Sequence, residues 1–234
     1  MEIQVYIAAH KQVELPKLDD CYIPIQVGSA GKKPLGYLTD DTGEHISPKN
    51  ENYCELTGMY WIWKNSASDV VGLCHYRRFL SQDGKILTRG QIENRMRDYD
   101  LICPDSGMSK YKNEYAHYCD RHRKRDLICC MDVVKERCPW YAQAFRWALS
   151  SNLVSMGNIL IARSDVFHAY CEWLFDILFE VESRTDLTDC DAYQKRLYGF
   201  LSERLFRAWL LMQKGLRVRE EPVLYMEREK DGPA

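Results

Sequence analysis

The sequence predicts a single α/β domain with a mainly parallel mixed sheet flanked by helices. Short runs rich in β-branched and aromatic residues alternate along the chain with longer segments whose apolar residues recur at spacings of three and four. Strands that alternate with helices in this way favour a parallel sheet. The chain has 234 residues, enough for one substantial core, so residues 1–234 are interpreted as one domain ending in a polar tail from about residue 226 to 234.

The N-terminal part of the chain supplies two strands, a loop and a helix. Residues 3–8 and 22–27 are apolar runs that predict buried strands. Residues 28–43 contain glycines, lysines and paired aspartates without a period, which indicates a long loop that is functional or mobile. Ser47 and Pro48 form an N-cap and first-turn pair, which predicts a helix running to about residue 64.

The central part continues the alternation. Residues between 105 and 125 are polar, aromatic and basic, and are interpreted as a solvated face, with a lid or a contact to an anionic acceptor as the alternatives. Ser164 is expected to cap the helix that follows the last of the central strands. The predicted elements are strands at 70–74, 100–103 and 158–162, and helices at 90–97, 126–137, 140–149 and from 165 onward.

The C-terminal part contains a final long helix, predicted from about residue 192 to 214. Its apolar stripe includes Leu197, Leu201 and Leu205, and Gly215 provides a stop. Polar and charged residues lie among the apolar positions, where such side chains are either paired internally or directed into a cleft. These residues are Gln194, Arg196, Glu203 and Arg204. Residues 217–225 are expected to return as a last strand.

Composition excludes several classes of protein. The formal net charge of −2 offers no overall field for nucleic acid or an acidic membrane surface. The ten cysteines are scattered without a Cys-x-x-Cys pair, so we expect reduced core thiols and no structural zinc. The N-terminus lacks the pattern of a signal peptide, and no apolar run of about 18 residues occurs. We therefore expect a cytoplasmic protein.

The segment Asp69-Val-Val-Gly-Leu-Cys-His-Tyr-Arg-Arg-Phe79 carries the strongest functional signal. It runs from an apolar strand directly into His75, Tyr76, Arg77 and Arg78. The carboxyl ends of strands in open α/β sheets are where ligands bind, and two adjacent arginines there favour a phosphate or carboxylate. The alternative is an arginine pair that makes weak surface ion pairs.

Further motifs identify a family resemblance. They include an N-terminal strand ending in Ala-Ala-His-Lys, the helix Glu55-Leu-Thr-Gly-Met-Tyr-Trp-Ile-Trp-Lys-Asn65, and two C-terminal blocks at residues 158–179 and 193–206. Together with Gly72-Leu-Cys-His-Tyr-Arg-Arg78 they resemble, over roughly residues 3–212, a family of bacterial capsular and exopolysaccharide sugar transferases. That family was long described as a domain of unknown function, and some members are galactofuranosyltransferases. Asn158-Ile-Leu-Ile stands where the family usually has Asn-Met-Phe-Ile.

The resemblance implies the Rossmann-like GT-A fold and a nucleotide-sugar donor, which by the same analogy is a uridine diphosphate sugar. In that fold the first strand and its loop hold the nucleoside, which here implies Ala8, Ala9, His10 and Lys11. A mid-chain strand of such enzymes usually ends in an Asp-x-Asp motif that binds a divalent metal. Here the corresponding strand ends in His75-Tyr76-Arg77.

Arginine can neutralise a departing diphosphate without a metal, so we favour a transferase that requires no cofactor. The competing prediction is Mn²⁺ or Mg²⁺ bound through Asp189 and Asp191, which form an Asp-x-Asp in letters but precede a helix. Asp191 is equally well explained as a helix cap.

Transfer with inversion needs a carboxylate base, and Asp191 and Glu203 are the candidates for that role. Tyr76 and Asn158 are candidates for contacts to the sugar, although a core tyrosine is an equal explanation. Gln194 and Arg196 are included with the donor-binding residues, together with His75, Arg77 and Arg78.

The expected partners are a nucleotide-sugar donor and a lipid-linked oligosaccharide acceptor in capsule, exopolysaccharide or O-antigen assembly. This places the protein at the inner face of the cell membrane, held there by partners in the assembly machinery, because the sequence shows no amphipathic anchor. Two other classes stay open. One is a non-catalytic protein that binds a nucleotide sugar or polysaccharide, and the other is a phosphoryl-transfer enzyme or phosphatase, which the missing P-loop disfavours.

Overall fold

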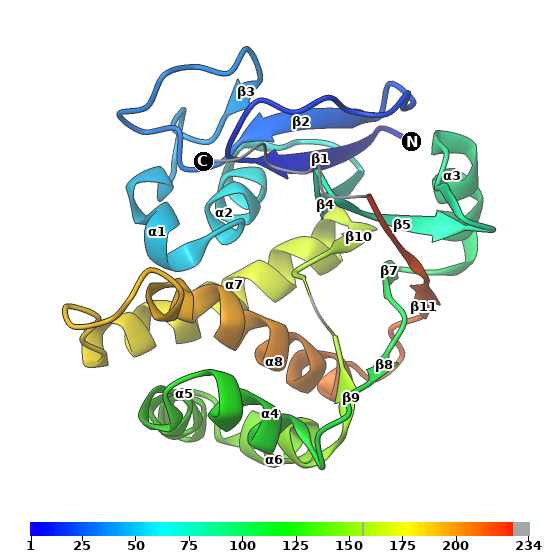
Figure 1. Cartoon of the computed structure of the whole chain (residues 1–234). Helices are drawn as coiled ribbons and strands as arrows, with labels where there is room; N and C mark the ends of the chain where they lie inside the picture. The colour runs from blue at the N-terminus through cyan, green and yellow to red at the C-terminus, as the bar shows by residue number, and fades with distance from the viewer. Residues whose placement is uncertain (156, 227–234) are drawn as a thin grey trace.

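The computed structural model describes residues 1–155 and 157–226. At its centre lies a mixed β-sheet whose main path has the strand order β11-β7-β10-β4-β1-β2-β3 (Figure 1). These strands are β1 (Ile3–Ala9), β2 (Tyr22–Gln26), β3 (Leu38–Thr39), β4 (Val70–His75), β7 (Leu101–Pro104), β10 (Leu160–Arg163) and β11 (Val218–Glu221).

The strand directions confirm the predicted fold class. β1 is parallel to both β2 and β4, β2 is parallel to β3, and β11 is parallel to β7. β10 alone on this path is antiparallel to its neighbours β4 and β7 among the described residues. In the central pair Ala8 lies opposite His75, so the carboxyl ends of β1 and β4 meet at one edge of the sheet.

A second group of strands branches from the end of β4. β5 (Arg78–Gln82) pairs with β4 at His75 and Arg78, and β6 (Lys85–Ile86) pairs with β5. β12 (Val223–Tyr225) runs antiparallel to β5, with Tyr225 opposite Arg78, and the backbone N–H of Met226 donates to the carbonyl of Arg77 at 3.0 Å. The two consecutive arginines are therefore held by the C-terminal strand. β8 (Gly107–Met108) and β9 (Leu153–Val154) form a separate small sheet.

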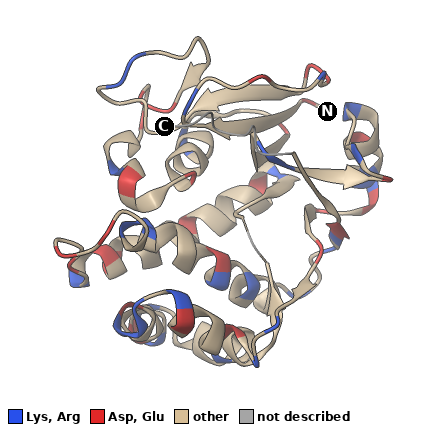
Figure 2. Ribbon diagram, viewed as in Figure 1, with Lys and Arg blue, Asp and Glu red and all other residues tan. Residues whose placement is uncertain are grey.

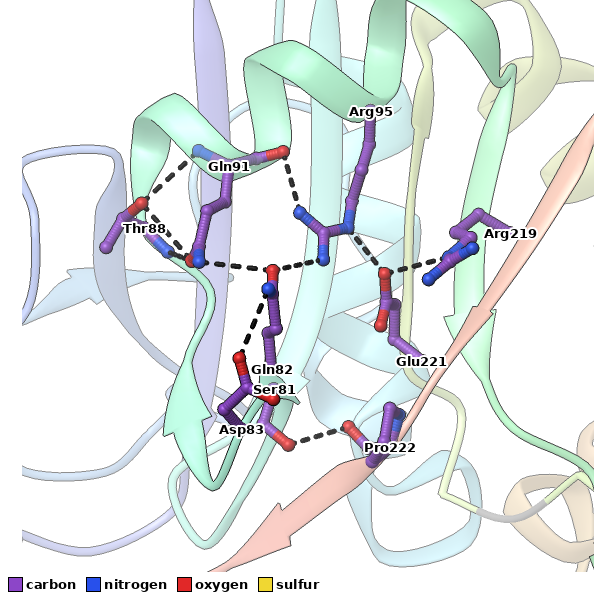
Figure 3. A network of polar contacts seen from close by, with 9 residues as sticks. All are labelled: Ser81, Gln82, Asp83, Thr88, Gln91, Arg95, Arg219, Glu221 and Pro222. Atoms are coloured by element: carbon purple, nitrogen blue, oxygen red, sulfur yellow. Dashed lines mark hydrogen bonds and ion pairs between the residues drawn. The ribbon is translucent and has the colours of Figure 1, made fainter.

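A buried carboxylate anchors this C-terminal strand region. Glu221, with a side chain only 4% exposed, accepts from Arg95 at 2.5 Å and from Arg219 at 3.0 Å (Figure 3). Arg95 also donates to Gln82 of β5 at 2.8 Å, and Ser81 donates to the carbonyl of Pro222 at 3.0 Å. Charged partners that satisfy one another in this way make burial of the carboxylate tolerable, and the network ties β5 to the chain's last described strands.

Helices cover the sheet. Figure 1 shows α7 and α8 crossing below the strands, with α4, α5 and α6 as a further helical layer and α3 beside β5. The apolar stripe of α7 is buried, including Phe167, Leu174 and Leu178, as its three- and four-residue spacing predicts. The helices are α1 (Asn50–Tyr53), α2 (Leu56–Asn65), α3 (Arg89–Asp98), α4 (Glu114–Arg121), α5 (Lys124–Arg137), α6 (Ala142–Ser150), α7 (Ser164–Arg184) and α8 (Leu197–Met212), with 3₁₀ turns η1 (Ser47–Lys49), η2 (Pro139–Tyr141) and η3 (Gln194–Arg196).

The helix predicted from residue 47 to 64 is interrupted at Cys54, which corrects the sequence interpretation. Cys54 has φ of +53°, a value that L residues rarely adopt. Its carbonyl accepts from Asn50 Nδ2 at 2.7 Å and from Thr57 Oγ1 at 3.2 Å, so side chains replace the helical hydrogen bonds. α2 therefore begins afresh at Leu56, directly after Glu55.

Other boundaries also differ from the predictions. Ser164 is the first residue of α7, and the N-cap position is occupied by Arg163, which makes no side-chain capping bond. The final helix is preceded by η3, and the predicted last strand is split at Pro222, because proline has no N–H to donate to a sheet. The polar tail predicted for residues 226–234 lies, after Met226, outside the described residues.

The loop predicted at residues 28–43 is folded around a buried acid. Asp40 is fully buried and accepts hydrogen bonds from the backbone N–H groups of Gly28 and Ser29, at 2.8 and 3.0 Å. The hydroxyls of Ser29 and Ser47 donate to the same carboxylate at 2.8 and 2.5 Å. These hydrogen bonds to a charged acceptor stabilise the conformation of the loop.

All ten cysteines are free thiols, and six of them are buried, as expected for reduced core residues. None of the helices in the described part of the chain combines the length and the hydropathy needed to cross a bilayer.

Candidate functional site

A cleft of about 720 Å³ opens where β1 and β4 end. The loop after β1 and the turn after β4 form one wall, and α4, η3 and the first turns of α8 form the other. The position matches the general rule that ligands bind at the carboxyl ends of strands in open α/β sheets. Its lining residues are Ala8, His10, Val27, Asn50, Glu51, Cys54, Glu55, His75, Arg77, Arg78, His117, Arg121, His122, Ala192, Tyr193, Arg196, Gly199, Phe200, Glu203 and Arg204.

The cleft concentrates positive charge. Arg77 and Arg78 approach it from the sheet, and Arg196 approaches it from the turn before α8. Elsewhere acidic and basic residues are interspersed along the ribbon (Figure 2), in keeping with the net charge of −2. The arginines are therefore a local feature, and planar guanidinium groups in such a cluster are suited to binding a phosphate or diphosphate.

The two histidines at the strand ends are held neutral. Burial, reinforced by Arg78 and Arg77, lowers the pKa of His75 to about 3. Burial also lowers the pKa of His10, with Lys11 and Arg77 adding to the effect. His75 Nδ1 accepts from the backbone N–H of Arg77 at 3.2 Å, which leaves Nε2 as the protonated nitrogen of the neutral ring. His75 thereby fixes the turn that presents the arginine and keeps a neutral donor beside it.

Tyr76 supports this wall from behind. Its ring is buried, lies 4.3 Å from the His75 ring and 5.6 Å from the His10 ring between centroids, and has the Arg77 guanidinium carbon 5.1 Å from its own centroid. Tyr76 packs against the residues that line the cleft and is not part of the lining itself.

A chain of buried charges forms the floor. Glu203 accepts from the backbone N–H of Gly157 at 2.7 Å and from Arg204 at 2.7 Å. Arg204 also lies 3.3 Å from Glu114, whose other oxygen is 2.7 Å from His117 Nδ1. Burial raises the pKa of Glu203, against the opposing effects of Arg204 and the Gly157 N–H. This series of paired charges links α8 to α4.

A second carboxylate, Glu55, lines the cleft at the start of α2. Asn158 Nδ2 donates to Glu55 Oε1 at 2.9 Å and to the carbonyl of Gly199 at 3.2 Å. On its other side, Asn158 Oδ1 lies 2.6 Å from Ser202 Oγ. Sequence reasoning missed Glu55, although it is the first residue of the helix motif, because a glutamate before a helix is usually explained as a first-turn charge.

Aromatic rings cover part of the wall contributed by the helices. His122 stacks on Phe200 with 4.1 Å between centroids, and Tyr193 lies 5.0 Å from Phe200. Tyr193 keeps 45% of its surface exposed, and the Arg196 guanidinium lies 5.2 Å from the centroid of Phe200. These rings were not predicted as site residues. His122 follows α4, which was not recognised in the basic segment between residues 105 and 125, and Tyr193 and Phe200 were noted only as part of the C-terminal block at residues 193–206.

The structure places some of the predicted site residues in the lining and others outside it. Those it brings together are Ala8, His10, His75, Arg77, Arg78, Arg196 and Glu203. Those outside the lining are Ala9, Lys11, Tyr76, Asn158, Gln194 and Asp191. Ala9 is buried in the core, while Asn158 is one contact away from the cleft through Glu55. Gln194 donates to the carbonyl of Arg121 at 2.8 Å and so joins the turn before α8 to α4.

The two aspartates of the Asp-x-Asp alternative lie on the surface before η3. Asp191 accepts from the backbone N–H of Gln194, the first residue of η3, at 2.7 Å, so its carboxylate stabilises the turn before α8, although Tyr193 occupies the N-cap position of η3. Asp189 is exposed. Within residues 1–155 and 157–226, no three His, Cys, Asp or Glu side chains are grouped so as to hold a metal ion.

Comparisons with known proteins identify a family and a similar solved structure. The family model described as "Domain of unknown function (DUF4422)" matches residues 4–214. No curated protein matches the chain. Among solved structures, the apo structure of WbbM, described as a bifunctional glycosyltransferase, is similar with 29% sequence identity and a TM-score of 0.88. The match covers 97% of this chain and 46% of that one, so the chain spans just under half the length of that protein.

Proposed function

The chain belongs to the DUF4422 family, and on that premise we propose that it is a glycosyltransferase. It moves a sugar from a nucleoside-diphosphate donor to a saccharide acceptor. The similarity to a bifunctional glycosyltransferase over nearly the whole of this chain supports the reaction class. Because this chain corresponds to 46% of that protein, one of its two activities is the most that the similarity supports.

The observation that carries the proposal is the arginine cluster at the ends of β1 and β4. Arg77, Arg78 and Arg196 line one cleft, and carboxylates line the same cleft. Sugar transfer needs both, because the leaving diphosphate develops negative charge while the attacking hydroxyl must lose a proton. The cleft has the volume expected for a ligand of the size of a nucleotide sugar.

We propose further that the donor is a uridine diphosphate sugar, with galactofuranose as the first sugar to test, and that transfer inverts the anomeric centre. The acceptor is a lipid-linked oligosaccharide of capsule, exopolysaccharide or O-antigen assembly, met at the inner face of the membrane. The support for these details is the resemblance carried by Glu55–Asn65, Gly72–Arg78 and the C-terminal blocks.

The proposed donor site works without a metal ion. Three guanidinium groups can supply the positive charge that a divalent cation supplies at an Asp-x-Asp motif. His75 and Arg77 stand at the end of β4, where such a motif would be expected in this kind of fold. The neutral Nε2–H of His75 adds a hydrogen-bond donor for a phosphate oxygen.

The proposal is tested by calorimetric titration with uridine diphosphate in chelator and then with manganese, followed by a transfer assay. The assay uses uridine diphosphate galactofuranose as donor and an octyl galactoside as a soluble acceptor, and it measures release of uridine diphosphate and formation of the disaccharide. We expect binding in chelator and acceptor-dependent release.

Three results would contradict parts of the proposal. Binding only with manganese would indicate that a metal ion is needed to hold the donor diphosphate. Binding without transfer to any saccharide would indicate a non-catalytic binding protein, and release of inorganic phosphate in place of the diphosphate would indicate a phosphatase.

A further inference from the structure

We propose that Glu55 is the general base of the transfer reaction and that Asn158 is the residue that positions it. The inference rests on the proposed glycosyltransferase function and assigns the proton-accepting group within the same cleft. Two buried or half-buried glutamates, Glu55 and Glu203, line that cleft. A general base needs a carboxylate oxygen that an acceptor hydroxyl can reach at about 2.6–3.2 Å and that no other donor occupies.

Glu203 does not meet this requirement. Its Oε1 accepts from the Gly157 N–H and its Oε2 accepts from Arg204, each at 2.7 Å, and its side chain is only 9% exposed. Its negative charge also compensates the guanidinium of Arg204, which is 2% exposed. Moving a proton onto Glu203 would remove the closer of the two carboxylates that compensate this buried cation, the other being Glu114 at 3.3 Å, which is unfavourable. Glu203 is therefore a fixed charge of the floor.

Glu55 does meet the requirement. It is half-buried, and it lies at the N-terminal end of α2, where it lines the cleft. Its Oε1 accepts a single side-chain hydrogen bond, from Asn158 at 2.9 Å. No hydrogen bond to its Oε2 is present among the described residues. One oxygen is thus held in place while the other keeps its lone pairs for an incoming hydroxyl.

Asn158 is itself fixed in the orientation that this role needs. Its Nδ2 has two acceptors, Glu55 Oε1 and the Gly199 carbonyl, and its Oδ1 faces the Ser202 hydroxyl at 2.6 Å. Exchanging the amide oxygen and nitrogen would set oxygen against oxygen at both acceptors. Asn158 also has φ of +50°, a conformation that asparagine tolerates better than most residues. Its backbone therefore aims the amide at Glu55.

The reaction is a direct displacement at the anomeric carbon. The acceptor O–H bond breaks and its proton passes to Glu55 Oε2, while the acceptor oxygen forms a bond to the anomeric carbon of the donor. The bond from that carbon to the β-phosphate oxygen breaks, and its electron pair leaves with the nucleoside diphosphate, whose charge is neutralised by Arg77, Arg78 and Arg196. The proton on Glu55 returns to solvent when the products leave.

The test compares Glu55→Gln with Glu172→Gln, a matched change at an exposed glutamate of α7. Loss of a general base should lower kcat by about 10²–10⁴-fold. Affinity for uridine diphosphate should stay within about twofold of the parent protein, because the glutamate takes no part in holding the diphosphate. Glu172→Gln should behave as the parent. In Glu55→Ala, added formate should restore part of the lost turnover, which a purely structural role would not allow.

The positioning role is tested with Asn158→Gly, because glycine keeps the positive φ and removes only the amide. We expect kcat to fall by about tenfold with the KM for the octyl galactoside and the affinity for uridine diphosphate unchanged. A fall in donor affinity with unchanged kcat would remove Asn158 from this role.

Failure of the Glu55 assignment and failure of the proposed function would give different results. If the parent protein transfers sugar and Glu55→Gln transfers it at the same rate, the assignment of Glu55 is wrong and the proposed function stands. If Glu203→Gln folds, binds uridine diphosphate and is inactive while Glu55→Gln is active, the base is Glu203. If the parent binds no uridine diphosphate and transfers no sugar, the proposed function fails and takes this inference with it.

Discussion

The backbone N–H of Gly157 donates to Glu203 at 2.7 Å and so joins α8 to the segment that leads into β10. Gly157 has φ of +96°, and a Cβ at this position would lie 3.2 Å from an Nη atom of Arg78. Glycine adopts this backbone conformation without the strain that an L side chain would cause, and a Cβ would also press on the end of the Arg78 side chain.

Replacing Arg77 by alanine should weaken binding of uridine diphosphate by about 10- to 100-fold, the usual effect of losing one charge-assisted contact to phosphate. The side chain packs on Tyr76 and lines the cleft, so the fold should be retained. Calorimetric titration measures the affinity, and Arg146→Ala on the exposed face of α6 is the matched control. Equal affinities in the two variants would show that Arg77 does not contact the diphosphate.

Replacing Asp191 by alanine should leave sugar transfer intact and reduce the free energy of unfolding by about 1 kcal/mol, as for loss of a helix cap. The reason is that its carboxylate accepts from the N–H of Gln194 at the start of η3 and does not line the cleft. Urea denaturation and the transfer assay measure the two effects. A large loss of turnover with little change in stability would restore Asp191 as a candidate base.

Replacing Asp40 by alanine should reduce the free energy of unfolding by about 3 kcal/mol, because two N–H groups and two hydroxyls lose a buried acceptor. Asp41→Ala is the control, since Asp41 is the adjacent carboxylate and is partly exposed. Urea denaturation of both variants measures the difference. Similar stabilities would mean that the loop does not depend on the buried acid.

His75 should make the protein less stable as the pH falls below 6.5. The folded protein keeps this ring neutral down to about pH 3, whereas the unfolded chain binds a proton near pH 6.5, so the unfolded state gains protons first. Between pH 7 and pH 5 the parent should lose about 1 to 2 kcal/mol more stability than His75→Asn. Asparagine retains an acceptor for the Arg77 N–H, and the other histidines contribute equally to both proteins.

Urea denaturation at pH 7 and pH 5 provides the comparison. The same change in stability for the parent and His75→Asn would show that His75 is protonated in the folded protein at pH 5, and it would remove the neutral ring from the proposed donor site.

The fold class followed from the sequence because it depends on patterns that burial imposes. The runs at 3–8, 22–27 and 70–74 became β1, β2 and β4 almost to the residue, since short, mostly apolar runs of this kind are typical of buried strands. What the patterns missed were elements held by particular side chains. The break at Cys54 depends on Asn50 and Thr57 bonding to one carbonyl, which has no periodic signature.

The site residues that are adjacent in sequence could be predicted, whereas those that meet only in the folded protein could not. His75, Arg77 and Arg78 follow one strand, so their meeting could be expected. Glu55 and Asn158 are 103 residues apart, and their contact exists only because the turn after Cys54 and the segment before β10 converge. A glutamate becomes a candidate base through its neighbours in space, and a single sequence does not contain that information.

The pairing of β12 with β5 has a consequence for the order in which the protein matures. Tyr225 lies opposite Arg78, and Met226 bonds to the carbonyl of Arg77. During synthesis the strands β1, β2 and β4 leave the ribosome first and can begin to assemble, but the hydrogen bonds from β12 and Met226 to the arginine turn form only after these later residues emerge. The proposed donor site is therefore completed after the strands on which it rests, so a nascent chain should acquire its central sheet before it acquires full affinity for a nucleotide.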